Sequence, residues 1–166
     1  FLNHQLDVKL LSCLGEDIYK HFENCEVTKV LTVEASGIGL ACMTAQFFNC
    51  RVLVAKKSKS ANISDDVYSA KVFSFTHGNV NDVIVSKEYL SSNDKVLIVD
   101  DFLANGEAAA GLIKVCRDAG AKVVGFSAAI CKTYQGGLQK IKDMGIDAYC
   151  LANISYMGEK GIEFSD

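Results

Sequence analysis

Apolar positions follow two patterns along the chain, one typical of helices and one typical of buried strands. Apolar side chains recur at helical spacing in residues 5–24, whereas 29–33 and 95–99 are almost continuously apolar, as in strands covered on both faces. The strands expected on this basis are 29–33, 52–55, 95–99, 122–130 and 148–151. The helices expected between them are 5–24, 37–48, 107–119 and 138–144. This alternation favours an α/β fold, in which a parallel-sheet core is flanked by helices.

One segment interrupts the alternation. Residues 67–77 mix β-branched and aromatic side chains with many polar ones, which indicates a strand, and 83–85 suits the second strand of a hairpin. This segment looks like a flap inserted into a single domain that spans 1–166. Because the chain begins at Phe1 and not at Met, we also expect native residues before it.

The composition is that of a folded domain and narrows the possible partners. Of 166 residues, 49% are hydrophobic and 22% are charged, which excludes an intrinsically disordered chain. The 17 Lys and Arg against 20 Asp and Glu give a net charge of −3, so nothing points to a nucleic-acid partner. No apolar run is long enough to span a bilayer, and we expect no membrane partner. The 7 Cys contain no C-x-x-C pair, which favours free thiols in a reducing cytoplasm.

The strongest chemical signal lies in residues 96–108, where the expected strand is followed by Asp100, Asp101 and a loop of small residues. Ligands of open α/β sheets bind at the carboxyl ends of the strands, and two adjacent carboxylates suit sugar hydroxyls or a cation there. Gly106 permits a positive φ angle, and the amide groups that open the next helix favour an anion such as a phosphate monoester. A ribose 5-phosphate has both features. The alternative is an ordinary strand-to-helix turn with acidic caps, because short motifs also arise by chance.

Two further strand ends carry groups suited to phosphates. Ser36 and Gly37 follow the first strand and open a helix, where free amides can hold an anion, although an ordinary helix cap has the same appearance. Lys56 and Lys57 follow the second strand. Their charges suit a diphosphate, and a solvated basic edge is the alternative.

The stretch VLIVDDFLANGEA, residues 96–108, resembles the phosphoribosyl diphosphate signature of the type I phosphoribosyltransferases, which has a hydrophobic strand, two acids, a small loop and a Gly. Most members carry Thr in the loop, where this chain has Ala104 and Asn105. Together with FLNHQLD at the start of the chain, this form is similar to the bacterial members that act on xanthine, and the resemblance covers nearly the whole chain.

This resemblance implies the type I phosphoribosyltransferase fold and a role in purine salvage. It also implies a small flexible hood at approximately residues 58–80 that would close over the substrate and exclude water, with a plain surface hairpin as the alternative. The implied reaction transfers phosphoribosyl from phosphoribosyl diphosphate to N9 of xanthine and gives xanthosine 5′-monophosphate and pyrophosphate. It also implies Mg²⁺, held through the substrate and bridged by water to Asp100 and Asp101, and a homodimer. The alternatives are a hypoxanthine/guanine phosphoribosyltransferase and a nucleotide-binding regulator of the same fold without catalysis. A phospho-acceptor receiver domain would also place acids at strand ends, but Glu34 and Lys132 match its other residues poorly.

The resemblance also assigns residues to the substrates. Asp100 and Asp101 would be catalytic, and Lys132 would read the 6-oxo group of the base, with Tyr134 stacking on its ring and Asn3 donating to the 2-oxo group. The residues that would contact phosphoribosyl diphosphate are Ser36, Gly37, Lys56, Lys57, Ala104, Asn105, Gly106, Glu107 and Ala108.

Overall fold

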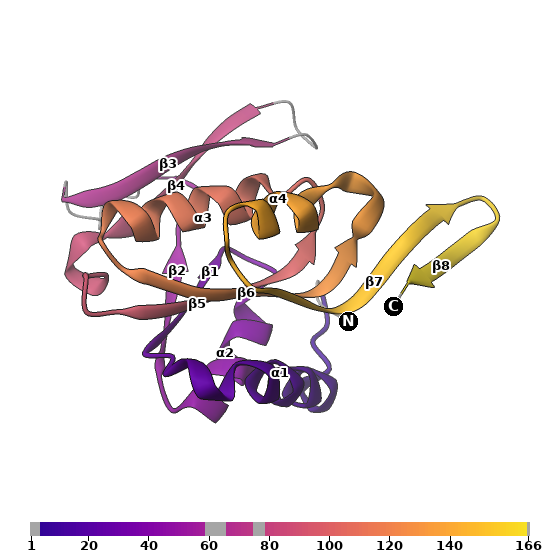
Figure 1. Ribbon diagram of the computed structural model, residues 1–166, viewed down its shortest axis with the longest axis horizontal. Helices are drawn as coiled ribbons and strands as arrows, with labels where there is room; N and C mark the ends of the chain where they lie inside the picture. Colours follow the sequence, from indigo (N-terminus) through magenta and orange to yellow (C-terminus); the bar gives the residue numbers. More distant parts are fainter. Residues whose placement is uncertain (1–3, 59–65, 75–78, 166) are drawn as a thin grey trace.

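The computed structural model describes residues 4–58, 66–74 and 79–165, and its centre is a six-stranded sheet (Figure 1). The strand order is β2-β1-β5-β6-β7-β8, parallel throughout except for β8, which pairs antiparallel with β7. The strands are β1 (Lys29–Val33), β2 (Arg51–Ala55), β5 (Lys95–Leu103), β6 (Lys122–Lys132), β7 (Ala148–Gly158) and β8 (Gly161–Ser165). The predicted α/β fold with a parallel core is therefore confirmed.

Helices cover both faces of this sheet (Figure 1). The helices are α1 (Val8–Phe22), α2 (Ile38–Phe48), α3 (Glu107–Asp118) and α4 (Gly137–Asp143), with short 3₁₀ helices η1 (Glu23–Cys25), η2 (Lys87–Tyr89) and η3 (Thr133–Gln135). One apolar core lies between α1, α2 and the sheet, where Ile18 and Leu40 pack near Leu97. The other lies under α3, where Leu112 packs near Ile98. Each of these fully buried side chains contributes about 1.5–3 kcal/mol to stability.

Local sequence explains where the helices begin and end. The Asp7 carboxylate accepts a hydrogen bond from the Leu10 N–H at 3.0 Å, so α1 begins at Val8 and not at the expected residue 5. Gly120 follows α3 with a φ of 72°, a conformation that glycine adopts without strain, and this end of the helix was predicted. In the described part of the chain, no helix combines the length and apolar character needed to cross a membrane.

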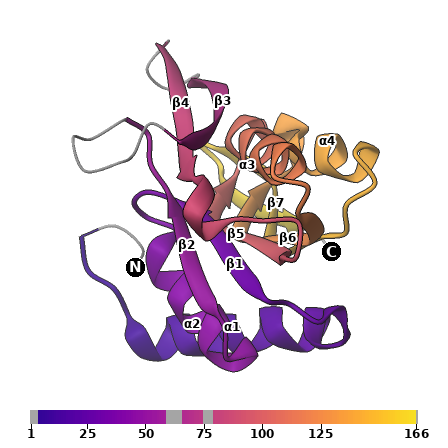
Figure 2. The ribbon, with the colours of Figure 1, turned by 90° about the vertical axis from the view of Figure 1, so that its left-hand side faces the viewer.

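A hairpin of β3 (Val67–Ser74) and β4 (Asn79–Ser86) forms a separate antiparallel sheet beside α3 (Figures 1 and 2). It packs closely on this helix, because a Cβ atom at Gly111 would lie 2.4 Å from Cγ2 of Val72. Two backbone hydrogen bonds between Lys56 and Ile84, of 2.9 and 2.8 Å, join it to the end of β2. The predicted hairpin is confirmed, while the rest of the expected hood, 59–65 and 75–78, lies outside the described residues. Its role as a hood stays a prediction.

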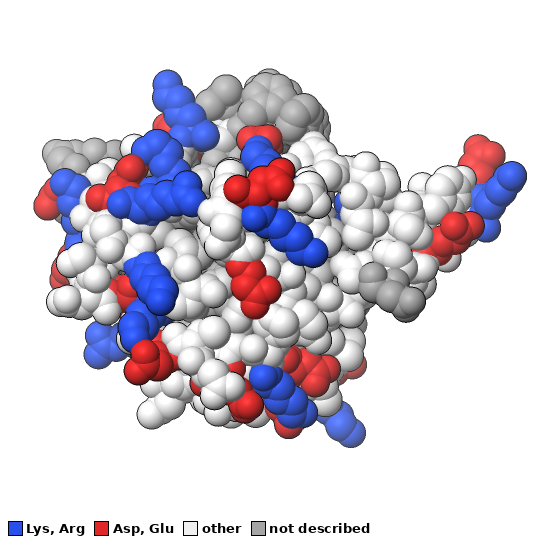
Figure 3. Space-filling model, in the orientation of Figure 1, with Lys and Arg blue, Asp and Glu red and all other residues white. Residues whose placement is uncertain are grey.

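The strands differ from prediction mainly at their carboxyl ends. β5 and β6 continue to Leu103 and Lys132, so Asp100 and Asp101 lie inside β5 and not after it. β7 runs to Gly158, and β8 was not predicted at all. Together they form an arm that projects from the sheet, mostly uncharged except near its tip (Figures 1 and 3). Apolar side chains of this arm, such as Phe164 at 68% exposed, lie at the surface. The alternation of buried apolar and exposed polar residues that marks a half-buried strand is therefore missing.

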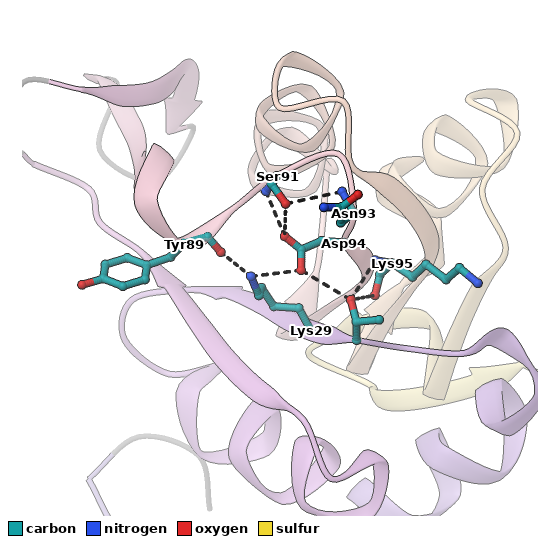
Figure 4. Close-up of polar contacts among 7 residues, drawn as sticks. Lys29, Tyr89, Ser91, Asn93, Asp94 and Lys95 are labelled. Atoms are coloured by element: carbon teal, nitrogen blue, oxygen red, sulfur yellow. Dashed lines mark hydrogen bonds and ion pairs between the residues drawn. The ribbon is translucent and has the colours of Figure 1, made fainter.

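A polar cluster at the amino end of the sheet holds β1 against β5 (Figure 4). The Lys29 ammonium lies 3.0 Å from Asp94 Oδ1 and donates to the Tyr89 carbonyl. Burial by itself would raise the pKa of Asp94, but the Ser91 N–H and the Lys29 ammonium outweigh it and hold the pKa below its usual value. This cluster ties the start of β1 to the segment that leads into β5, and so aligns their carboxyl ends, where the site lies.

Candidate active site

A cavity of about 230 Å³ opens at the carboxyl ends of the central strands. Its lining combines the end of β5 and the start of α3 with Val33, Lys57 and the hairpin residues Val72, Asn81 and Val83. Asp100 and all five predicted loop residues, 104–108, belong to this lining. The segment that carries the strongest sequence signal therefore forms the largest part of the cavity wall, at the edge where ligands of α/β sheets bind.

Asp100 lies almost fully buried in this wall, at 7% exposed, while Asp101 is half-buried. Burial, followed by the side-chain hydrogen bond and charge of Asp101, raises the pKa of Asp100 well above its usual value, and the Asp101 N–H and the Lys57 ammonium oppose this only in part. The Asp101 N–H donates to Asp100 Oδ1 at 2.9 Å. Such a buried carboxyl with a shifted pKa in a cavity is typical of a functional group rather than a stabilising one.

Asp100→Asn is expected to raise the melting temperature at neutral pH. This rise should be larger at neutral pH than in acid. The native state binds the Asp100 proton more tightly than the unfolded chain, so this residue stabilises the protein below the usual carboxyl pKa and loses that effect as the pH rises through the higher, native pKa. An amide has no charge to bury. The rise is about 2–4 °C for each ~1 kcal/mol in a domain of this size. Thermal melts of the wild type and the variant from about pH 4 to 8 test this, because that range begins near the usual carboxyl pKa and extends above it. A variant that melts below the wild type at neutral pH would contradict it.

The loop after β1 packs directly on Asp100. A Cβ atom at Gly37 would lie 2.9 Å from Asp100 Oδ1 and 2.6 Å from Thr32 Oγ1, so glycine permits this close approach. The Glu34–Ala35 peptide in this loop is cis. Gly37 caps α2 without any side-chain bond, while Ser36 is exposed. Gly37 and not Ser36 is therefore the cap residue of α2, and neither of these two predicted residues belongs to the cavity lining.

Glu34 links this loop to the loop after β2, a connection that the sequence pattern did not indicate. Its carboxylate accepts from the Lys57 N–H at 2.7 Å and pairs with the Lys56 ammonium at 3.3 Å. The Lys57 N–H is the main reason that the pKa of Glu34 is lowered. The two predicted lysines therefore differ: Lys57 lines the cavity, whereas the Lys56 ammonium turns to Glu34.

The loop between β5 and α3 has the form of an anion cradle. Gly106 caps α3 with a φ of 78° and makes no side-chain bond, so the amides of the first turn lack helical partners. Gly137, which was not among the predicted residues, supports the loop from behind: its N–H donates to the Ala104 carbonyl at 3.0 Å. A Cβ atom at Gly137 would lie 2.3 Å from that oxygen. The Gly136-Gly137 pair was the available sequence signal. The Glu107 carboxylate forms an ion pair with the Lys140 ammonium.

The predicted base-contacting residues that the structure describes are not part of the cavity lining. Lys132 ends β6, and its ammonium lies 5.9 Å from the ring centroid of Phe102. Phe102 lines the cavity and is 42% exposed, which makes it a second missed residue, recognisable as an aromatic at the end of a buried strand. Tyr134 lies in η3, is half exposed and is not part of the cavity lining. Asn3 falls outside the described residues.

Two comparisons with known proteins identify relatives of this chain, and a scan against family models finds no match. Xanthine phosphoribosyltransferase of Clostridium novyi is 47% identical over 166 residues, 100% of this chain and 87% of the relative. Xanthine phosphoribosyltransferase of Lachnoclostridium phytofermentans is 48% identical over 157 residues, 95% of this chain and 81% of the relative.

Solved structures show the same fold at lower identity. Adenine phosphoribosyltransferase of Thermoanaerobacter pseudethanolicus is 20% identical with a TM-score of 0.77, covering 89% of this chain and 82% of its own. The enzyme of Trypanosoma brucei, in complex with AMP, pyrophosphate and ribose-5-phosphate, is 14% identical with a TM-score of 0.79, covering 93% and 69%. The fold is thus that of the type I phosphoribosyltransferases, and by its identity to the bacterial relatives the chain belongs to the xanthine phosphoribosyltransferase family.

Proposed function

We propose that this protein transfers the 5-phosphoribosyl group from phosphoribosyl diphosphate to N9 of xanthine and releases pyrophosphate and xanthosine 5′-monophosphate, a reaction of purine salvage. The observation that carries the proposal is the wall of the cavity, which brings together Asp100, the amide cradle 104–108 and Lys57. These groups suit the ribose, the 5-phosphate and the diphosphate of one substrate. The name of the relatives supports xanthine as the base.

The cradle binds the part of the substrate that does not react. The free amides at the start of α3 and the helix dipole attract the 5-phosphate. Small side chains in Ala104 and Ala108 let the phosphate approach the backbone. Because this phosphate is remote from the bond that breaks, its binding energy orients C1 of the ribose toward the base.

The reacting centre needs charge stabilisation rather than a covalent nucleophile. As the bond from C1 to the diphosphate breaks, positive charge develops on the ribose and negative charge on the leaving group. Asp100 and Asp101 hold the ribose hydroxyls, while Lys57 and the loop with Ser36 and Gly37 stabilise the departing diphosphate. As an alternative role, we propose that Asp101 accepts the N7 proton of the base.

The two carboxylates also suit Mg²⁺. Within the described ranges, no group of three or more His, Cys, Asp and Glu residues could hold a metal ion. Mg²⁺ commonly takes only one or two carboxylates together with substrate phosphates and water, and adjacent Asp100 and Asp101 offer this donor set. The ion would neutralise the diphosphate, and Asp100 and Asp101 would hold its water ligands.

The rim of the cavity is suited to an oxopurine. The Phe102 ring offers a face for the base, and the nearby Lys132 ammonium can donate to a 6-oxo group. Adenine has an amino group at this position, which is itself a donor, so Lys132 selects against it. Tyr134 and Asn3 remain proposed contacts of the base. We also propose that the protein assembles into a homodimer. The seven cysteines are all free, which suits the reducing cytoplasm that we propose as its location.

The test is a competition assay with xanthine, hypoxanthine and guanine at a fixed concentration of phosphoribosyl diphosphate. We expect xanthine to be preferred. Lys132→Ala is expected to raise the KM for xanthine at least about tenfold, the usual loss for a hydrogen bond from a charged donor, without changing the KM for phosphoribosyl diphosphate. Lys122→Ala, at the opposite end of the same strand, is the matched control.

Two outcomes would overturn parts of this proposal. If hypoxanthine or guanine reacts faster than xanthine, the protein is a hypoxanthine/guanine enzyme. If Lys132→Ala instead weakens phosphoribosyl diphosphate and spares the base, Lys132 does not read the base.

A further inference from the structure

The cradle for the 5-phosphate carries a carboxylate at its rim. Glu107 is the first residue of α3 and directly follows the cap residue Gly106. An acid in the first turn stabilises a helix through the dipole, but here it competes with the ligand. A phosphate monoester carries about −1.5 to −2 charges at neutral pH, so an isolated Glu107 carboxylate would repel it and could itself turn toward the free amides.

Lys140 of α4 counters this charge. Its ammonium lies 2.6 Å from Glu107 Oε1, and the two side chains are only 36% and 34% exposed, so solvent screens this pair less than it screens pairs on the open surface. The Lys140 N–H donates to the Gly136 carbonyl at 3.1 Å, and the adjacent Gly137 is bonded to the loop itself. The helix that buttresses the cradle thus also carries the ammonium that pairs with its acid.

We propose that Lys140 is a positioning residue for the 5-phosphate: by pairing with Glu107 it holds that carboxylate away from the cradle amides and cancels its charge. Lys140 therefore acts through Glu107 and not by contact with the substrate. This inference rests on the proposed function and adds a residue to it that neither the sequence motif nor the cavity lining includes.

The experiment is a double-mutant cycle in the full chain, measured in both directions of the reaction. Lys140→Met removes the ammonium and keeps a long side chain of similar helix propensity. We expect the KM to rise about tenfold for phosphoribosyl diphosphate and for xanthosine 5′-monophosphate, which both carry the 5-phosphate. The KM for pyrophosphate and for xanthine should stay within about twofold, as should kcat, because neither molecule enters the cradle. Lys140→Arg should retain the wild-type values.

The second arm removes the charge that Lys140 is proposed to cancel. Glu107→Gln alone should lower the KM for phosphoribosyl diphosphate about two- to threefold, because one repulsive charge is gone. Adding Glu107→Gln to Lys140→Met should return that KM to within about twofold of the wild type. Lys142→Met, on the same helix, is the matched control. Melting temperatures of all variants show whether the fold is retained.

The outcomes separate the two proposals. If the wild type makes no nucleotide from phosphoribosyl diphosphate and any oxopurine, the proposed function is wrong. If the wild type is active but Lys140→Met leaves both KM values unchanged, the role of Lys140 is wrong and the function stands. The role is also wrong if the double variant is no better than Lys140→Met, since Lys140 would then serve only to support the helix.

Discussion

Replacement of both acids at the end of β5, Asp100→Asn with Asp101→Asn, is expected to lower kcat roughly 100- to 1,000-fold, the range for loss of a central electrostatic or proton-accepting group. The amides keep the size of the carboxyls, and an Asn oxygen at residue 100 can still accept the hydrogen bond from the N–H of residue 101. The variant loses the negative charge of the two acids. In the proposed mechanism this charge holds the ribose hydroxyls and stabilises the positive charge that develops at C1. Initial rates of xanthosine 5′-monophosphate formation measure the effect.

A matched pair of adjacent acids is available as the control. Glu16 and Asp17 lie exposed on α1, where each pairs with Lys20, and surface pairs of this kind contribute at most about 1 kcal/mol. Glu16→Gln with Asp17→Asn should therefore retain wild-type turnover. If the variant at 100 and 101 also turned over normally, these acids would have no catalytic role.

Gly137→Ala is expected to lower kcat/KM for phosphoribosyl diphosphate about 100-fold, although residue 137 touches no substrate, because a displacement of the cradle by ~1 Å has this scale of effect. The new Cβ atom would lie 2.3 Å from the Ala104 carbonyl oxygen and 2.8 Å from the Gly106 nitrogen. Both atoms are backbone, so the loop must move as a unit. The strain also lowers stability by about 1–3 kcal/mol.

Gly145→Ala separates the two effects. Gly145 has a φ of 77°, and a Cβ atom at this residue would meet no other atom within 4 Å, so alanine strains the backbone there without touching the cradle. It should destabilise the protein by about 1 kcal/mol and leave kcat/KM unchanged. Steady-state kinetics and thermal melts of both variants provide the comparison. Equal kinetics for Gly137→Ala and the wild type would mean that the loop does not need this support.

Sequence patterns predicted the central sheet because its strands are buried on both faces and are therefore almost continuously apolar, as 95–99 shows. The same logic fails for β8, whose five residues are all exposed. It also placed the strand ends too early, because Asp100 and Lys132 are polar yet still paired in the sheet. Polarity marked these residues as functional but did not mark the end of the strand.

The candidate site divides in a similar way. Residues that carry charge or close a turn next to a strand were predictable from the linear sequence, as with Asp100, Lys57 and Gly106. Residues that act by supporting the site across the fold were not. Gly137 lies far along the chain from the loop that it contacts, and Glu34 holds the Lys57 backbone by a hydrogen bond that only the packed loops create. Such contacts depend on distances between elements, which a motif does not contain.

The two hydrogen bonds between the backbones of Lys56 and Ile84 connect the hairpin with the edge of the sheet. Because Lys57 follows directly and lines the cavity, the hairpin cannot swing away from the body unless these bonds break or the segment with Lys57 moves with it. Amide hydrogen exchange at Lys56 and Ile84 therefore reports on both at once. Slow exchange at these two positions would mean that the segment with Lys57 and the hairpin move together as one rigid unit.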